Sequence, residues 1–384
     1  MDFATTPEQD ALVETAARFA DARLVPFYKQ REREGRFDRP TLEEMGRLGF
    51  FGPELPDQHG GLGLDCVTAG LVLEALCAGD YNIGQLLVTI SLAGTVLVRN
   101  GDPVVVSPWI REMLAGRALP AIGLTEPGGG SDAARLSVRA VRDGDEYVIS
   151  GEKTSTTFVT QAAFAIVWAR TGPPGGGAGG ISTFLVPMDR PGIEIGEFED
   201  MGGCAAGRGW MNLDSVRVPA SHLIGPEGKG FTQVMQGFDY SRALIGLQCL
   251  AVARQSLKET WVSVGERSSF GKPLASHQGV SFPLAEAETQ VHACRLMCLQ
   301  TLWLKDRGLP HTAEAAMCKW WGPKLAFDVV QTCLLLHGHG GYSTELPFEQ
   351  RLRDVLGLQI GDGTAQIMKL VIARHKAGRD ARSG

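Results

Sequence analysis

Residues 121–132 read AIGLTEPGGGSD, a short apolar run that ends in a glycine-rich turn. The apolar part predicts a strand over 121–125, and the polar part predicts the turn that ends it. A dinucleotide-binding fold would need a helical crossover directly after the glycines, and no helical pattern follows here. The stretch therefore predicts a β-domain. Its glycine turn either only ends the strand or also donates N–H and hydroxyl groups to a bound phosphate.

Helical patterns precede this strand. Thr6 is a predicted N-cap, Pro7 takes the first helical position, and Gln9 completes a capping box. Apolar residues at helical spacing predict further helices over 41–48, 67–78, 83–100 and 103–115. We therefore expect an N-terminal helical domain over residues 1–120.

Strand patterns follow the glycine turn, and helical patterns return after them. Two alternating runs flank Asp143-Gly144, which predicts a hairpin. Strands are predicted over 138–141, 147–149, 164–169, 181–186 and 210–218, and helices over 229–264, 282–304 and 312–336. The expected fold class is α+β, with a barrel-like or sandwich-like middle β-domain over 121–226 and a C-terminal helical bundle over 227–384.

The composition narrows the partners of the chain. Of 384 residues, 44% are hydrophobic and 21% are charged, and the net charge of −6 argues against nucleic acid as a partner. The sequence has no uninterrupted apolar run of about eighteen residues, the length that a membrane span needs. Residues 1–4 lack the pattern of a signal peptide. We therefore expect no membrane association and a cytoplasmic location.

Cysteines and histidines give no metal signature. Eight cysteines are scattered without a Cys-x-x-Cys pair, which fits reduced thiols in a cytosol. Cys294 and Cys298 share a helix face with apolar neighbours, which favours a core position. His337 and His339 flank a glycine without a third ligand nearby, so we predict no metal site.

A second glycine-flanked stretch, QIGDGTAQ at 359–366, places a carboxylate before a helical pattern. Glycines let the backbone approach a ligand, and free N–H groups at a helix start favour anions. Asp362 is therefore a candidate base aimed at a bound molecule, with Thr364 beside a phosphate. The alternative is that Asp362 is only the N-cap of the following helix.

Several motifs, taken in order, resemble the acyl-CoA dehydrogenase family of flavoproteins. They are GLTEPGGGSD at 123–132, ERSSFGKPLASHQ at 266–278, GGYSTELPFEQRLRD at 340–354 and GDGTAQI at 361–367. The resemblance covers nearly the whole chain. It implies that FAD lies between the β-domain and the last bundle, and that the protein is a homo-oligomer, usually a tetramer and possibly a dimer.

The resemblance also implies roles for individual residues. Asp362 aligns with the catalytic base. Substrate contacts are implied for Ser131, Asp239, Arg242 and Gly363. FAD contacts within one subunit are implied for Leu124, Thr125, Gly130, Ser131, Ser155, Thr157, Thr364 and Gln366. Arg267, Phe270 and Gln278 match contacts to the FAD of a neighbouring subunit, and cofactor contacts are also expected for His277 and Gly338.

The implied reaction converts an acyl thioester to the 2,3-enoyl thioester. Asp362 would take the α proton, the β hydride would pass to flavin N5, and an electron-transfer flavoprotein would accept the electrons. The acyl carrier is either CoA or an acyl carrier protein. The alternatives are a flavin oxidase of the nitroalkane oxidase type, which also uses an aspartate base, and an inactive family member that acts as a binding protein.

Departures from the family pattern bear on the substrate. The usual glutamate base is Asp362, which is shorter by roughly 1.5 Å, the length of one bond. Some members carry the base at the position of Ser241, which cannot serve. Ser155 replaces the usual tryptophan beside the flavin, and 204–206 lacks a usual arginine and serine. If these changes reflect a carrier protein, we expect an electropositive rim, because carrier proteins are usually acidic.

Overall fold

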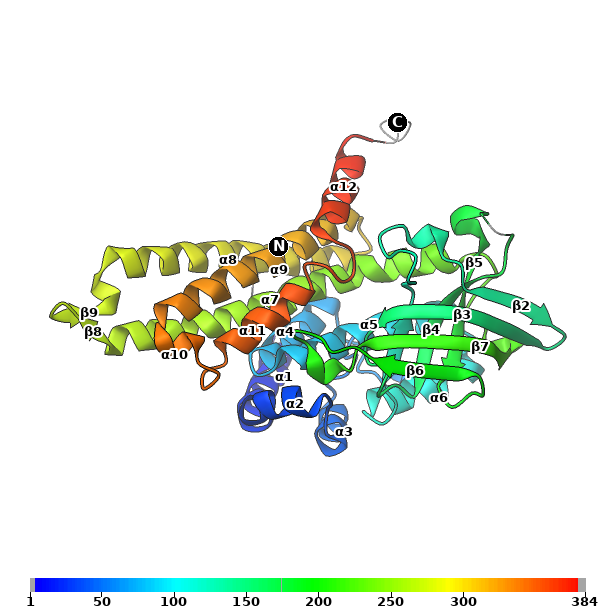
Figure 1. The fold of residues 1–384 in the computed structure, drawn as a ribbon, viewed down its shortest axis with the longest axis horizontal. Helices are drawn as coiled ribbons and strands as arrows, with labels where there is room; N and C mark the ends of the chain where they lie inside the picture. Colours follow the sequence, from blue (N-terminus) through cyan, green and yellow to red (C-terminus); the bar gives the residue numbers. More distant parts are fainter. Residues whose placement is uncertain (1–3, 174, 379–384) are drawn as a thin grey trace.

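The computed structural model describes residues 4–173 and 175–378. Residues 1–3, on which the expectation of no signal peptide partly rests, lie outside this range. N-terminal helices, a middle β-sheet and a C-terminal helical bundle follow one another along the chain (Figure 1). The predicted α+β arrangement is therefore confirmed.

The N-terminal helices begin with the predicted capping box. The Thr6 side chain accepts a hydrogen bond from the Gln9 amide, and the Gln9 side chain accepts one from the Thr6 amide. The local patterns do not predict α2, a seven-residue helix that buries Tyr28 and Arg31. The helices of this part are α1 (Pro7–Phe19), α2 (Tyr28–Glu34), α3 (Arg39–Arg47), α4 (Cys66–Cys77), α5 (Tyr81–Asn100) and α6 (Pro103–Leu114).

The middle region forms one seven-stranded sheet. Its strands are β1 (Pro120–Gly123), β2 (Arg139–Asp143), β3 (Glu146–Thr156), β4 (Phe164–Arg170), β5 (Ile181–Pro187), β6 (Ile193–Glu197) and β7 (Gly209–Pro219). Their order is β1-β4-β2-β3-β7-β6, and β5 pairs with β4. The predicted hairpin joins β2 to β3, with Asp143 opposite Glu146. The sequence does not predict β6, because two glutamates and a glycine among its five residues hide the pattern.

Both faces of β4 are buried, which places the sheet between two cores. Phe164, Ile166 and Trp168 belong to the large core shared with the helices. The intervening residues, such as Val167, belong to a smaller core inside the β-domain, because side chains alternate along a strand. Trp168 Nε1 donates to the Gly230 carbonyl at 3.0 Å and so joins the sheet to the next helix.

That helix, α7 (Gly230–Glu266), has 37 residues. At about 1.5 Å per residue it is about 55 Å long. It runs from the sheet to the β8–β9 hairpin, which lies at the end of the bundle farthest from the sheet (Figure 1). The remaining elements are β8 (Ser268–Ser269), β9 (Lys272–Pro273), α8 (Gln278–Asp306), α9 (Thr312–Leu336), α10 (His339–Tyr342), α11 (Phe348–Gly357) and α12 (Ala365–Lys376).

The helix α5 is long and apolar enough to span a membrane by length and composition alone. In this fold 89% of its most apolar window is buried, as in a core helix. Cys294 and Cys298 are also buried in the large core, as predicted. Across the two described ranges, no cluster of three or more His, Cys, Asp or Glu side chains could hold a metal ion.

Candidate active site

The base loop, defined as residues 358–364, connects α11 to α12. Asp362 has a φ of 53° and Gly363 a φ of 97°, so two consecutive residues are left-handed. A Cβ at Gly363 would lie 2.7 Å from Met368 Cε, the movable end of a flexible side chain, so the φ rather than the space favours glycine here. The loop thus has the unusual backbone that its glycines suggest.

Thr364, not Asp362, caps α12. The Thr364 hydroxyl accepts a hydrogen bond from the Ile367 amide at 3.4 Å. The alternative that Asp362 is only an N-cap is therefore wrong. Within residues 4–173 and 175–378, the Asp362 carboxylate has no hydrogen-bonded or ion-paired partner. The carboxylate is consequently free to accept a proton.

Two cations from the bundle influence Asp362. Desolvation raises the pKa of Asp362, and the charges of Lys319 and Arg242 oppose this rise. The side chain is solvent-exposed in the single chain, although protein surrounds it closely enough to desolvate the carboxylate. A base that must remove a proton from carbon benefits from a pKa shifted upward.

Arg242 of α7 is paired on one side only. Its Nη1 lies 3.3 Å from Asp239 Oδ1, and Asp239 Oδ2 accepts from the Thr312 hydroxyl at 2.6 Å. Its buried Nε has no partner among the residues that the structure describes. Desolvation lowers the pKa of Arg242, and the charges of Asp239 and Asp362 raise it. The structure thus brings Arg242 within the electrostatic influence of Asp362, with Asp239 as its ion-pair partner. Sequence patterns gave no signal for Thr312.

A buried ion pair anchors the glycine turn. Lys153 Nζ lies 2.7 Å from Glu126 Oε1 and donates to the Leu124 carbonyl at 3.1 Å. Glu126 also accepts hydrogen bonds from the amides of Ser137 and Val138. Sequence patterns gave no signal for this pair. The two residues are 27 positions apart, so no local pattern connects them.

The exposed face of the glycine turn carries donors. Gly130 and Ser131 are exposed, whereas the only carboxylate of residues 124–131, Glu126, is buried and paired. Thr125 accepts a hydrogen bond from the Thr154 amide at 2.9 Å, which ties the turn to β3 just before Thr157. The structure therefore brings together the segments 124–131 and 155–157 that sequence analysis assigned to one cofactor.

Ser155 has an unexpected neighbour. Its hydroxyl accepts a hydrogen bond from Arg208 Nη1 at 2.9 Å. The Arg208 guanidinium also pairs with Asp200 and lies 5.1 Å over the ring of Phe198. An arginine thus stands beside the position where the family usually has a tryptophan. Sequence analysis missed Arg208 because it lies 53 residues away from Ser155.

A cavity of about 380 Å³ lies next to this arginine; it is lined by Glu197, Phe198, Glu199, Asp200, Cys204 and Arg208. Three carboxylates face one guanidinium. The electropositive rim expected for a carrier protein is therefore absent from these lining residues.

Backbone strain gathers at predicted site residues. Five non-glycine residues of the described chain have left-handed φ values: Ser155, Phe158, Ser215, Phe270 and Asp362. Ser155, Phe270 and Asp362 are predicted site residues. Such strain costs about 1–3 kcal/mol per residue and persists where surrounding structure imposes it, often at functional sites.

Gln366 lies in the first turn of α12, whereas the other predicted cofactor residues lie at the far end of the bundle. Phe270 is 96% exposed in the β8–β9 turn. Arg267 donates to the carbonyls of Leu336 and His337, next to Gly338 with its φ of 64°. His277 and Gln278 lie at the start of α8. Because α7, about 55 Å long, separates this end from the sheet, one chain cannot bring both groups to one small cofactor.

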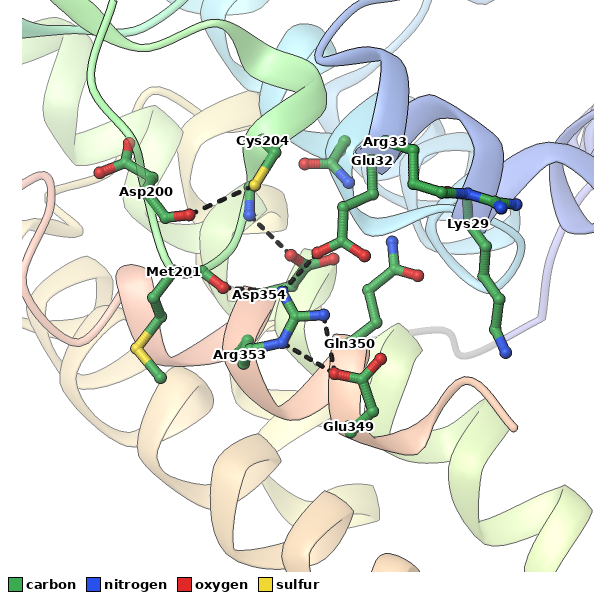
Figure 2. A network of polar contacts seen from close by, with 12 residues as sticks. Lys29, Glu32, Arg33, Asp200, Met201, Cys204, Glu349, Gln350, Arg353 and Asp354 are labelled. Carbon is green, nitrogen blue, oxygen red and sulfur yellow. Dashed lines mark hydrogen bonds and ion pairs between the residues drawn. The ribbon is translucent and has the colours of Figure 1, made fainter. Parts of the chain in front are cut away.

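A polar junction anchors α11, the helix that leads into the base loop (Figure 2). Arg353 of α11 pairs with Glu32 of α2. Asp354 accepts hydrogen bonds from the Gly203 amide, between β6 and β7, at 2.7 Å and from the Tyr28 hydroxyl. Desolvation by burial raises the pKa of Asp354 to about 7. All three parts of the chain therefore meet at α11.

The N-terminal helices, the middle sheet and the C-terminal helical bundle follow the domain order of one enzyme family. The chain matches models of the acyl-CoA dehydrogenase N-terminal domain over residues 6–117, middle domain over 121–216 and C-terminal domain over 228–377. The chain belongs to the acyl-CoA dehydrogenase family, whose members depend on FAD.

Similar proteins extend over the full length of the chain. Probable acyl-CoA dehydrogenase YngJ of Bacillus subtilis is 34% identical, covering 98% of this chain and 99% of the relative. A chain in the structure of the electron transferring flavoprotein of Acidaminococcus fermentans has a TM-score of 0.95 at 31% identity, covering 98% of this chain and 99% of the other. A glutaryl-CoA dehydrogenase from Mycobacterium smegmatis, solved with FADH2, has a TM-score of 0.91 at 27% identity, covering 97% and 95%.

Proposed function

We propose that this protein dehydrogenates an acyl-CoA and that Asp362 removes the α proton. The base loop is the observation that carries this proposal. It holds a carboxylate in a left-handed turn, without a bonded partner in the described chain, and with its pKa raised by desolvation. A general base that is near its substrate and tuned upward in pKa suits the removal of a proton from carbon.

FAD is the proposed cofactor, and the donor set of the sheet end fits it. Exposed glycines and Ser131 suit a phosphate, and Lys153 neutralises the one carboxylate of the turn. Leu124, Thr125 and Thr157 would hold the ring. When bound, FAD supplies the acceptor for the hydride that leaves the β carbon.

The chain itself would move one proton and stabilise one developing charge. Lys319 and Arg242 favour the ionised form of Asp362 before the reaction, against its desolvation. The Asp362 N–H has no backbone acceptor in the described part of the chain, so it is available to the thioester oxygen. A fixed donor at an oxygen that gains charge stabilises the transition state.

CoA is the proposed acyl carrier. The family acts on acyl-CoA, and the cavity beside Ser155, with three carboxylates to one guanidinium, offers no electropositive surface to an acidic carrier protein. Comparing kcat/KM for one acyl group on CoA and on a carrier protein tests this choice. A strong preference for the carrier protein would contradict it.

A homo-oligomer is proposed because Arg267 and Phe270 lie too far from the glycine turn of their own chain. They would complete the FAD site of a neighbouring subunit, as a tetramer or dimer. We expect Arg267→Ala to weaken both FAD binding and the oligomer. Titration of the FAD-free protein measures the first, and sedimentation measures the second. Full FAD affinity in this variant would rule out the shared site.

An electron-transfer flavoprotein is the proposed electron acceptor. The structural match to a chain from the electron transferring flavoprotein of Acidaminococcus fermentans supports it. Anaerobic mixing with a panel of acyl-CoAs should bleach the bound flavin, and an electron-transfer flavoprotein should restore its colour. Steady peroxide formation from nitroalkanes would instead identify the oxidase, and failure of every thioester to bleach the flavin would identify a binding protein.

A further inference from the structure

The Lys319 side chain crosses from α9 to the base loop. It is 1% exposed. Its Nζ donates to the Leu358 carbonyl at 2.6 Å and to the Gly363 carbonyl at 2.8 Å. These carbonyls lie near the two ends of the base loop and enclose Asp362 between them. One ammonium group therefore bridges the loop from start to finish.

This burial is unfavourable for a lysine unless its charge is compensated. Lys319 has no ion pair within 4.0 Å among the described residues, unlike the buried Lys153. Desolvation lowers the pKa of Lys319 to about 8, and the negative charge of Asp362 is the largest influence that raises it. The negative charge of Asp362 thus favours the charged form of Lys319, and the hydrogen bonds of Lys319 hold the loop that carries Asp362.

We propose that Lys319 is the positioning residue of the base: it clamps the two ends of the base loop and keeps Asp362 ionised. This inference rests on the proposed role of Asp362. The clamp explains how a left-handed aspartate followed by a left-handed glycine is held in place, because the two hydrogen bonds fix the carbonyls on both sides of Asp362. An ammonium bonded to carbonyls, rather than to a carboxylate, leaves the base free.

The charges around the clamp are few. Among the described residues, Asp362 and Arg242 of α7 are the charged groups that influence Lys319, and the nearby Cys249 of α7 is a neutral thiol because burial raises its pKa. Three charged residues of the neighbouring helices contact other groups. In α11, Arg351 pairs with Glu259, and Asp354 accepts from Tyr28. Lys369 of α12 lies over the ring of Trp320.

The test compares Lys319→Met and Lys319→Gln with the matched control Lys324→Met. Lys324 lies on the same helix, but its side chain is 54% exposed and pairs with Asp328. Hydrogen exchange of the peptide that covers 358–364, in the FAD-free and FAD-loaded proteins, reports the clamp without any turnover. The pH profile of kcat/KM for flavin reduction by an acyl-CoA reports the charge on Asp362.

We expect Lys319→Met to speed exchange in 358–364 about tenfold or more, because two hydrogen bonds are lost. Removing a nearby cation raises the pKa of Asp362, so the acid limb of kcat/KM should move up by about one pH unit. Lys319→Gln keeps a hydrogen-bond donor but loses the charge. It should therefore shift the acid limb of kcat/KM as much as Lys319→Met does, but speed hydrogen exchange in 358–364 less. Lys324→Met should match the wild type in both.

Wild-type exchange together with an unmoved acid limb, in either Lys319 variant, would overturn the proposal. If Lys319→Met does not fold, the Gln variant decides by the same two measurements. The proposed function fails separately. Wild-type flavin reduction by Asp362→Asn would remove Asp362 as the base, while exchange in 358–364 would still decide whether Lys319 clamps the loop.

Discussion

Two buried lysines hold the two loops of the site; both donate to loop carbonyls, but only Lys153 also pairs with a carboxylate. Lys153 binds the glycine turn through a carboxylate, Glu126, at 2.7 Å. Lys319 binds the base loop through two carbonyls, at 2.6 and 2.8 Å. Desolvation lowers the pKa of each lysine to about 8. The environments therefore impose a similar burial penalty but differ in what compensates it.

The difference separates a structural loop from a reactive one. The Glu126 carboxylate is bonded to Lys153 and to the amides of Ser137 and Val138, so it is not available to accept a proton from a substrate. Asp362 feels the charge of Lys319 without being bonded to it. A carboxylate that must take a proton needs a cation near enough to keep it ionised, yet not locked onto it.

The largest expected effect comes from removing the free carboxylate. Asp362→Asn keeps the size of the side chain and removes the base. The kcat/KM for flavin reduction should fall by about a hundredfold to ten-thousandfold, the usual contribution of a general base. Stopped-flow reduction with an acyl-CoA measures this, and FAD content and hydrogen exchange should remain those of the wild type. A near-normal rate of flavin reduction in this variant would mean that the base loop is not the reactive one of the two loops.

Breaking the locked pair should affect folding rather than chemistry. Lys153→Met leaves Glu126 buried without its cation, which costs about 3–5 kcal/mol of unfolding free energy. Urea unfolding measures the loss, and the FAD content should drop with it. Lys153→Met with Glu126→Gln should recover part of the stability. The control is Arg217→Ala on the surface of the same sheet, whose exposed pairs should matter little.

Lengthening the base tests how tightly the base loop is fixed. Because the clamp holds the backbone on both sides of Asp362, Asp362→Glu should push its carboxylate too far into the substrate site. A misplacement near 1 Å costs about a hundredfold, so we expect kcat/KM to fall by roughly ten- to a hundredfold. Single-turnover reduction checks it. A rate equal to or above that of the wild type would mean that aspartate is only tolerated here.

The most gradual expected effect, spread over several pH units, concerns the junction that holds α11. Asp354 has a folded pKa of about 7 against an ordinary value of 3.8. The folded state therefore binds a proton more tightly, and this contribution is complete below pH 4 and lost as the pH rises through 7. Asp354→Asn mimics the protonated acid. The free energy of unfolding of the wild type should fall by at most about 1.4 kcal/mol per pH unit between these limits relative to the variant. Parallel pH curves from urea unfolding would contradict the assigned pKa.

Local patterns predicted what depends on neighbours in the chain. Thr6, Pro7 and Gln9 fixed the first helix start, and alternation around Gly144 fixed the hairpin. Patterns failed where a fold contact outweighs the local signal. The short α2 is stabilised through buried Tyr28 and Arg31, which bond residues far along the chain. The N-cap alternative for Asp362 failed because Thr364, two residues later, makes the cap.

The sequence alone determined the order of helices, sheet and helices, the family, and the candidate base, because periodicity, glycine turns and ordered motifs are local features. Only the tertiary structure decided how the site is held. Lys153 and Glu126 are 27 residues apart, and Lys319 is 39 and 44 residues from the two carbonyls it binds. Which buried cation meets which loop depends on how α7, α9 and the sheet pack, and packing brings together residues that no spacing in the chain connects.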